Sequence, residues 1–256
     1  MNLLIDVGNS RLKWAREQAG QISSIQAVDY RQDHAYQNLE QQWQTLPRPS
    51  KIAIACVGAA QQITALEALA NRLWPAIEII LPKSSVAFGS VINAYPNPEK
   101  LGVDRWLALL AAHQHYRGNS CIIDCGTAIT LDFIDSHGQH RGGLISPGLL
   151  LMKKSLAQNT AALDLDQQTR ALALADNTRH AIDSGCLLAA IGLIETAIKR
   201  YPPVEQVIMT GGDADLISQY LSMVLIVDQK LVFKGLQQIN ALNPINKGLI
   251  FKPYDL

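Results

Sequence analysis

Two short segments of similar sequence, far apart in the chain, each carry an aspartate and a glycine in a pattern suited to phosphate binding. They are residues 3–10 (LLIDVGNS) and residues 121–128 (CIIDCGTA), and each is an apolar strand that ends in Asp-x-Gly. The glycine permits a tight turn and close approach of the backbone to a ligand. The polar residue after it can donate to phosphate oxygens, and the aspartate can hold a cation or position water. Two such loops could hold one polyphosphate, as in a two-lobed phosphotransferase.

The alternative for a single Asp-x-Gly segment is an ordinary hairpin turn, because such turns join strands in many folds. Its recurrence at the start of the second half of the chain favours a functional architecture. A further loop at residues 210–214 (TGGDA) follows an apolar strand, and its paired glycines would let backbone pack flat against a planar ring such as adenine. A plain strand-to-helix turn explains this loop equally well. The chain has neither the Gly-x4-Gly-Lys-Ser/Thr nor the Gly-x-Gly-x-x-Gly pattern, so a nucleotide would be bound by the paired aspartate loops.

A third segment, residues 102–105 (GVDR), opens a predicted amphipathic helix. Asp104 lies in the first turn of this helix, where a negative charge is favourable beside the helix dipole. A carboxylate there could also orient an acceptor hydroxyl, because phosphoryl transfer through a loose transition state does not require a strong base. Arg105 could neutralise phosphate or clamp a carboxylate through two hydrogen bonds. From the residues alone, Asp104 and Arg105 could serve either the stability of the helix or phosphoryl transfer.

Other reactive side chains give weaker signals. His137 and His140 flank a glycine turn and are expected to face solvent. Cys121 and Cys125 lie on either side of Asp124, but no second Cys/His pair at normal spacing completes a zinc site. We therefore expect these two cysteines to be buried, unreactive thiols.

The pattern of apolar residues predicts two α/β domains related by duplication, residues 1–117 and 118–256, and not one doubly wound sheet. Each half begins with a strand hairpin and then alternates strands with helices. The turn at residues 117–119 is the expected boundary, and a polar stretch near residues 164–170 interrupts the second half. Expected strands are residues 1–7, 11–16, 50–57, 78–81, 121–135 (a hairpin) and 206–209, and expected helices are residues 61–73, 103–116, 149–158 and 181–200.

Composition excludes some partners and compartments. The 256 residues include 22 Lys and Arg against 22 Asp and Glu, so there is no electrostatic reason to expect nucleic acid or an anionic membrane as a partner. No uninterrupted apolar run reaches the roughly 20 residues that cross a bilayer. Asp6 interrupts the first apolar stretch and no basic segment precedes it, unlike a signal peptide. With four cysteines that form no disulfide framework, the expected location is cytoplasmic.

Taken together and in this order, the motifs resemble the type III pantothenate kinases, a branch of the acetate/sugar kinase–Hsp70–actin superfamily. The combination of Gly-x-Asp-Arg with Gly-Gly-x-Ile-x-Pro-Gly is more specific than the phosphate loops that the whole superfamily shares. The matching stretches span nearly the whole chain: residues 6–13 (DVGNSRLK), 102–105 (GVDR), 124–128 (DCGTA), 142–148 (GGLISPG), 178–182 (TRHAI) followed by Gly185, and 210–214 (TGGDA).

The resemblance implies a fold, a reaction and partners. The fold would be two ribonuclease-H-like domains, the actin-like ATPase fold, with the active site in the interdomain cleft. The reaction would be ATP-dependent phosphorylation of pantothenate to 4'-phosphopantothenate, the first step of coenzyme A biosynthesis. The protein would be a homodimer with the substrate pocket near the dimer interface.

The resemblance also implies roles for individual residues. Asp104 would be the proton acceptor. Asp124 would help to bind a monovalent cation, K⁺ or NH₄⁺, and Asp6 would help to place Mg²⁺ through the phosphates. The residues implied to bind ATP are Asp6, Val7, Gly8, Asn9, Ser10, Arg11, Leu12, Lys13 and Thr127. Those implied to bind pantothenate are Tyr95, Gly102, Val103, Asp104, Arg105 and Thr178.

Three other functions are compatible with the loops. A kinase of the same superfamily could act on a sugar or another small acid, although residues 102–105 and the short length argue against it. A nucleotide-binding regulator would not need the acceptor carboxylate Asp104. An actin-like or chaperone-like ATPase would need further subdomains, for which 256 residues leave no room.

Overall fold

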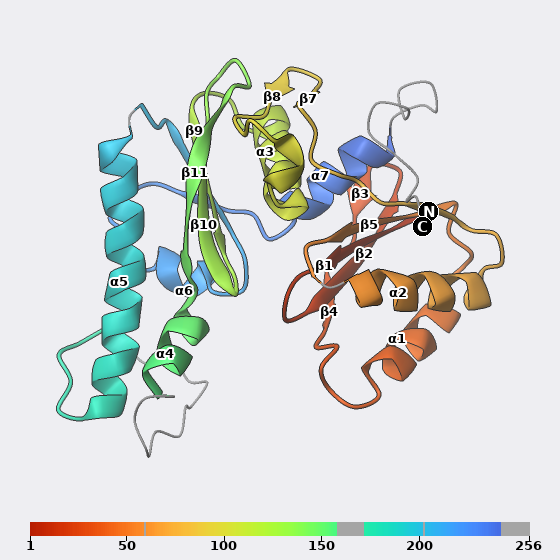
Figure 1. Ribbon diagram of the computed structural model, residues 1–256, viewed down its shortest axis with the longest axis horizontal. Coiled ribbons are helices and arrows are strands. Elements are labelled where there is room, and N and C mark those ends of the chain that lie inside the picture. Colours follow the sequence, from red (N-terminus) through yellow and green to blue (C-terminus); the bar gives the residue numbers. More distant parts are fainter. Residues whose placement is uncertain (59, 158–171, 202, 242–256) are drawn as a thin grey trace. The chain divides into compact units, whose positions relative to one another are not determined.

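The computed structural model describes residues 1–58, 60–157, 172–201 and 203–241. The polar stretch near residues 164–170 and the predicted end of a helix at Gln158 lie outside these residues. The chain forms two compact units, one made of Met1–Gln114 with the chain from Lys230 onward, and the other of His115–Gln229 (Figure 1).

The first unit is built on a mixed sheet with strand order β3-β2-β1-β5-β6, and β4 also pairs with β2. Strands β1 and β2 form an antiparallel hairpin, whereas β5 runs parallel to β1 and β6 runs parallel to β5. Because helices cover both faces of β1, Leu3, Leu4 and Ile5 are all fully buried, which explains its continuous apolar run. The bounds are β1 Asn2–Val7, β2 Leu12–Gln18, β3 Gln21–Ile22, β4 Gln26–Val28, β5 Lys51–Cys56 and β6 Glu78–Ile80.

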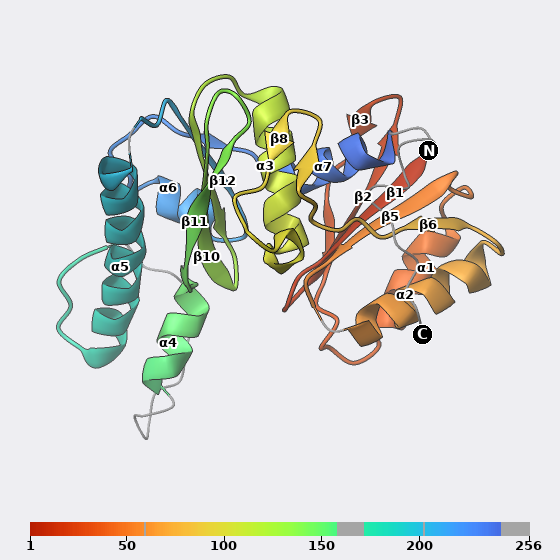
Figure 2. The ribbon, with the colours of Figure 1, turned by 45° about the horizontal axis from the view of Figure 1, so that its top comes forward.

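Helices α1 (Ala35–Gln44) and α2 (Ala60–Leu73) lie together on one face of this sheet, and α7 (Leu231–Asn240) lies on the other, as Figure 1 and Figure 2 show. Trp43 of α1 stacks on Trp74 with ring centroids 5.9 Å apart and meets Trp14 of β2 edge-on at 6.2 Å. These three indoles fill the space between the sheet and the two helices. The short β7 (Ala87–Phe88), β8 (Val91–Ile92) and η1 (Pro98–Lys100) lead into α3 (Val103–His115).

The second unit repeats this plan with strand order β11-β10-β9-β12-β13. Strands β9 and β10 form the antiparallel hairpin, and β12 runs parallel to β9, as β5 does to β1. Most of the glycine-rich segment 142–148 lies in the edge strand β11, which pairs with β10. The bounds are β9 Ser120–Cys125, β10 Ala128–Ile134, β11 His140–Pro147, β12 Gln206–Thr210, β13 Ile226–Val227, α4 Leu149–Ala157, α5 Thr178–Arg200 and α6 Ala214–Ser218.

The predicted elements are present with a few shifted boundaries, but other elements were missed. The strands that were not predicted are β3, β4, β7, β8, β11 and β13. Helix α5 begins at Thr178, three residues before its predicted start, because the Asn177 side chain caps it by accepting from the His180 N–H. Helices α1 and α7 were not predicted. α7 packs on β1 and β5, so it belongs to the first compact unit, whereas the domain boundary expected after residue 117 stays a prediction.

Helix α5 is long and apolar enough, by length and composition, to cross a membrane. In the structure its buried side chains, among them Cys186, Leu187 and Ile194, pack against β9 and β12 in the core of the second unit. It is therefore a partly buried core helix, although a substantial apolar part of its surface stays exposed.

One prediction about a histidine is wrong. His137 is exposed as expected, but His140 is buried, and its Nε2 lies 3.0 Å from Oδ1 of the buried Asp132. The alternation of side chains along β11 turns His140 inward. The expectation for Cys121 and Cys125 is confirmed, because both are buried and burial raises the pKa of each thiol far above its usual value.

Candidate active site

The first Asp-x-Gly segment forms a closed turn between β1 and β2. The N–H of Gly8 donates to the carbonyl of Arg11 at 3.0 Å. Asp6 and Lys13 face each other across the base of this turn in the antiparallel register, and both are half-buried. A carboxylate and an ammonium group therefore flank a loop whose tip, at Asn9, is exposed.

Residues from two other segments hold this turn in place. The N–H of Val57, just after β5, donates to the Val7 carbonyl at 3.1 Å. The hydroxyl of Tyr30 donates to the Gly8 carbonyl at 2.8 Å. A Cβ on Gly58 would lie 3.4 Å from that same carbonyl oxygen. Sequence reasoning missed Tyr30 and Gly58, because neither belongs to an Asp-x-Gly segment or to a charged motif.

The predicted acceptor segment lies at the start of α3 in the same unit. Asp104 is half-buried, and its Oδ1 accepts from the backbone N–H of Arg105 at 2.8 Å. A Cβ on Gly102 would lie only 2.6 Å from this Oδ1, so a larger residue at position 102 would displace the Asp104 carboxylate. The guanidinium of Arg105, a residue that is only 7% exposed, donates to the Tyr95 hydroxyl at 3.0 Å and lies 5.7 Å from the centre of that ring.

A cavity of about 390 Å³ adjoins the acceptor segment. Gly102 and Val103 line it together with Lys83, Glu99 and Lys100. Of the predicted substrate residues only Gly102 and Val103 line this opening, and Tyr95, Asp104 and Arg105 do not. The rest of its wall is largely apolar.

The second Asp-x-Gly segment joins β9 to β10 in the other unit. Gly126 donates to the Ala128 carbonyl at 3.0 Å, and Gly148 donates to the Thr127 carbonyl at 2.9 Å. A Cβ on Gly148 would overlap the Gly126 carbonyl oxygen and lie 2.7 Å from that of Thr127. The end of the glycine-rich segment therefore packs directly against this loop, and the Thr127 side chain stands at its exposed tip.

The loop at residues 210–214 packs against the same segment from the side of β12. Gly211 has φ of +96°. A Cβ there would overlap Oδ1 of Asp124 and lie 2.6 Å from the backbone N and C of Cys125. The Asp213 N–H donates to the Cys125 carbonyl at 2.9 Å. Asp124, the second Asp-x-Gly loop and the loop at residues 210–214 are therefore neighbours.

The predicted site residues are divided between the two units. The first unit holds residues 6–13, Tyr95 and residues 102–105, and the second holds Asp124, Thr127 and Thr178. Thr178 is the exposed first residue of α5. Within each unit the structure brings the segments of the Asp-x-Gly loops together with their supporting glycines.

Within the described ranges, no group of three or more His, Cys, Asp or Glu side chains could hold a metal ion. A Mg²⁺ ion that arrives with a nucleotide is usually bound through one or two carboxylates plus substrate phosphates. Cys56 lies near Asp6, but burial and then the charge of Asp6 raise the pKa of its thiol, so it is a poor nucleophile.

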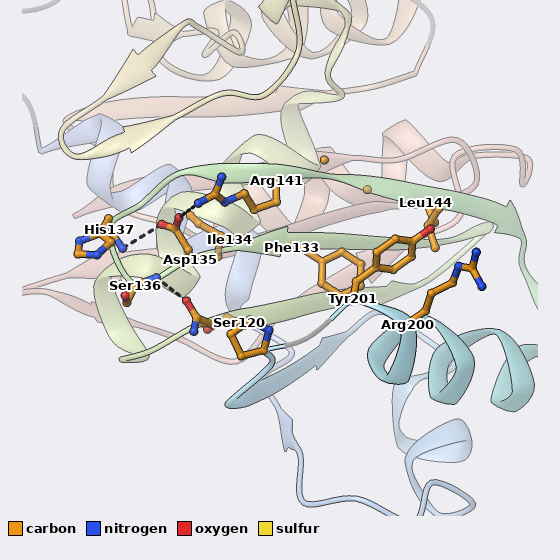
Figure 3. Close-up of a pocket in the computed structure, with 14 residues that line it drawn as sticks. Ser120, Phe133, Ile134, Asp135, Ser136, His137, Arg141, Leu144, Arg200 and Tyr201 are labelled. Carbon is orange, nitrogen blue, oxygen red and sulfur yellow. Dashed lines mark hydrogen bonds and ion pairs between the residues drawn. The ribbon is translucent and has the colours of Figure 1, made fainter.

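A cavity of about 930 Å³ lies elsewhere in the second unit, between the β10–β11 hairpin and the end of α5 (Figure 3). Phe133 and Tyr201 lie side by side in its wall, and Arg141 forms an ion pair of 2.6 Å with Asp135. None of the predicted site residues lines it. Its charged pair, Arg141 and Asp135, is internally satisfied.

The paired sheets and their Asp-x-Gly turns define the class of protein. A Campylobacter jejuni protein assigned to the Baf family of transcriptional activators superposes with a TM-score of 0.60 at 23% identity, covering 93% of this chain and 96% of that one. The activator of 2-hydroxyisocaproyl-CoA dehydratase from Clostridium difficile, solved with bound ADPNP, gives 0.53 at 12% identity, with coverage of 100% and 99%. These likenesses confirm the predicted actin-like ATPase fold of two mixed α/β units.

Sequence comparison then identifies the family. Residues 2–200 match the family model of type III pantothenate kinase. Type III pantothenate kinases from Nitrosococcus oceani and Laribacter hongkongensis are 37% and 36% identical, covering 93% and 95% of this chain and 93% and 100% of theirs. The chain belongs to the type III pantothenate kinase family. It is a soluble metabolic kinase that uses ATP to phosphorylate pantothenate to 4'-phosphopantothenate, the first step of coenzyme A biosynthesis.

Proposed function

We propose that the two Asp-x-Gly loops bind the phosphates of ATP, residues 6–13 from the first unit and Thr127 from the second. The exposed tips at Asn9 and Thr127 and the hydrogen bonds that close both turns support this assignment. Asp6, opposite Lys13, would place Mg²⁺ through the phosphates, and the ion would neutralise part of their charge.

Pantothenate would bind at Tyr95 and residues 102–105, with a further contact from Thr178. Arg105 supports this role because its guanidinium is held by Tyr95, so little conformational freedom is lost when it pairs with the substrate carboxylate. The charged residues around the adjoining cavity favour a small acid over a neutral sugar.

Asp104 would act on the acceptor hydroxyl. The primary hydroxyl oxygen of pantothenate forms a bond to the γ-phosphorus, the bond from that phosphorus to the bridging oxygen of ADP breaks, and the hydroxyl proton passes to Asp104. Because Oδ1 already accepts a hydrogen bond, the carboxylate is oriented before substrate binds, which is the main requirement in a loose transition state.

Asp124 would help to bind a monovalent cation, K⁺ or NH₄⁺. Gly211 supports this role, because its lack of a side chain leaves room for the Asp124 carboxylate. The cation would supply positive charge beside the triphosphate in a protein whose own net charge is zero.

We also propose that the protein is a cytoplasmic homodimer. The solvent-exposed side of α5 carries Leu188, 58% exposed, and two glycines, Gly185 and Gly192, whose Cβ positions meet no atom within 4 Å. Leu188 lies three residues after Gly185 and four before Gly192, on the same side of the helix, and small residues permit close helix packing. This side of α5 is the proposed dimer interface.

The observation that carries the proposed mechanism is the oriented Asp104 carboxylate beside the Arg105–Tyr95 pair. The test is Asp104→Asn, with Asp33→Asn as the control, because Asp33 is an exposed carboxylate of the same unit that does not line the adjoining cavity. We expect Asp104→Asn to lose turnover at least about 100-fold while the affinity for ATP stays near that of the wild type. Near-normal turnover in the folded Asn variant would remove Asp104 as the proton acceptor.

A further inference from the structure

The side chain of Tyr30 forms a hydrogen bond to the backbone of the first phosphate loop. It lies after β4, outside both the β1–β2 hairpin and the motifs that define the family. Its hydroxyl reaches back to the Gly8 carbonyl, 22 residues away in sequence, at 2.8 Å. A contact of this kind, made from a separate segment, constrains the loop independently of the hairpin itself.

The direction of this hydrogen bond matters for anion binding. In a trans peptide the C=O and the following N–H point in opposite directions. When Tyr30 binds the Gly8 carbonyl on the inner side of the loop, the N–H of Asn9 is therefore turned to the outer side. The Val7 carbonyl is likewise occupied, by the Val57 N–H at 3.1 Å. Two carbonyl oxygens that would repel a phosphate are thus directed into the protein.

The surroundings of Tyr30 keep its hydroxyl protonated, so that it can donate a hydrogen bond. Burial raises the pKa of its hydroxyl, so the proton needed for the hydrogen bond stays in place at neutral pH. A Cβ on Gly58 would lie 3.9 Å from the Tyr30 hydroxyl, and the ring packs against the apolar core of the first unit. The ring is therefore fixed by packing and its hydroxyl by the loop.

We infer that Tyr30 is a positioning residue for the kinase reaction, which fixes the Gly8–Asn9 peptide so that the Asn9 N–H faces a phosphate of ATP. This inference rests on the proposed binding of ATP by residues 6–13. Without the Tyr30 hydroxyl the peptide can rotate and present the Gly8 carbonyl to the phosphate, which weakens ATP binding and leaves pantothenate binding unchanged.

The test compares Tyr30→Phe with Tyr36→Phe in steady-state kinetics. Tyr36 is a suitable control because it belongs to the same unit and packs against the same core, but its hydroxyl bonds to Gln62 of α2. A neutral hydrogen bond contributes about 1 kcal/mol, equivalent to about a fivefold change in affinity. We expect Tyr30→Phe to raise KM for ATP about fivefold with KM for pantothenate unchanged, and Tyr36→Phe to change neither.

A third variant, Lys13→Met, separates failure of this inference from failure of the proposed ATP site. If Lys13→Met raises KM for ATP but Tyr30→Phe does not, or if Tyr36→Phe raises it equally, the role of Tyr30 is refuted and the ATP loop stands. If neither Lys13→Met nor Tyr30→Phe changes KM for ATP, the loop assignment fails as well. Hydrogen exchange gives a readout that stability alone would not move: ATP should protect the Asn9 amide in the wild type and much less in Tyr30→Phe.

Discussion

Gly211 offers the sharpest test of how the second unit is built. Its φ of +96° lies in a region that costs an L-residue about 1–2 kcal/mol. An alanine Cβ would also lie 2.6 Å from two backbone atoms of Cys125. These atoms belong to β9, which is paired on both sides by β10 and β12, so they cannot easily move away. Overpacking of this kind costs about 1–3 kcal/mol.

Gly211→Ala should therefore destabilise the protein by about 2–5 kcal/mol, which at this chain length lowers Tm by about 4–20 °C. Gly212→Ala is a matched control one residue away, because Gly212 has no positive φ and its Cβ would meet nothing within 4 Å. We expect its Tm to lie within about 2 °C of the wild type. Differential scanning fluorimetry of the three proteins measures this directly. Equal Tm values for the two variants would refute the steric reasoning and the placement of Gly211 against Asp124.

Three further predictions concern the cation, a buried ion pair and the dimer. Asp124→Ala should weaken activation by K⁺, seen as a shift of the K⁺ titration of turnover to higher concentration; an unchanged titration would place the cation elsewhere. Lys153 and Asp183 form a buried ion pair of 2.6 Å between α4 and α5. Asp183→Ala should lower the free energy of unfolding in urea by about 3–5 kcal/mol, because it leaves the Lys153 charge buried without its partner. The double variant Lys153→Met/Asp183→Leu removes both charges and should leave the free energy of unfolding nearly unchanged. Equal losses in the two variants would show that the unpaired charge is not the cause. Leu188→Glu should convert the dimer to a monomer in light scattering, and a wild type that is already monomeric would contradict the proposed interface.

The fold was largely predictable because local pattern and global architecture agree. The apolar runs of β1 and β9 and the Asp-x-Gly turns after them recur in both halves, and the structure gives both sheets the same order of hairpin and parallel strands. Helix α1 escaped prediction because it is rich in polar residues and anchors itself mainly through Leu39 and Trp43. Helix α7 escaped because the reason for its position, packing on β1 and β5, is more than 170 residues away in sequence.

The candidate site residues that the sequence suggests are those whose type and charge indicate chemistry, and the residues it misses are those that support a loop. Asp104 and Arg105 could be selected from the sequence because two opposite charges follow a glycine at the start of a predicted helix. The structure adds that the Arg105 guanidinium donates a hydrogen bond to Tyr95. Tyr30 gives no such signal, because a tyrosine in a turn resembles many others until its hydrogen bond to Gly8 is seen. His140 was misjudged for the same reason: a histidine beside a turn looks solvent-facing unless the strand register that buries it against Asp132 is known.

The most direct test of the central claim is ADP release by the purified protein with Mg-ATP and pantothenate, in K⁺ and in Na⁺, beside the Asp104→Asn variant. The account predicts ADP release that depends on pantothenate, is higher in K⁺ than in Na⁺, and is lost in the variant. ADP release that is the same with and without pantothenate, or that persists in Asp104→Asn, would contradict it.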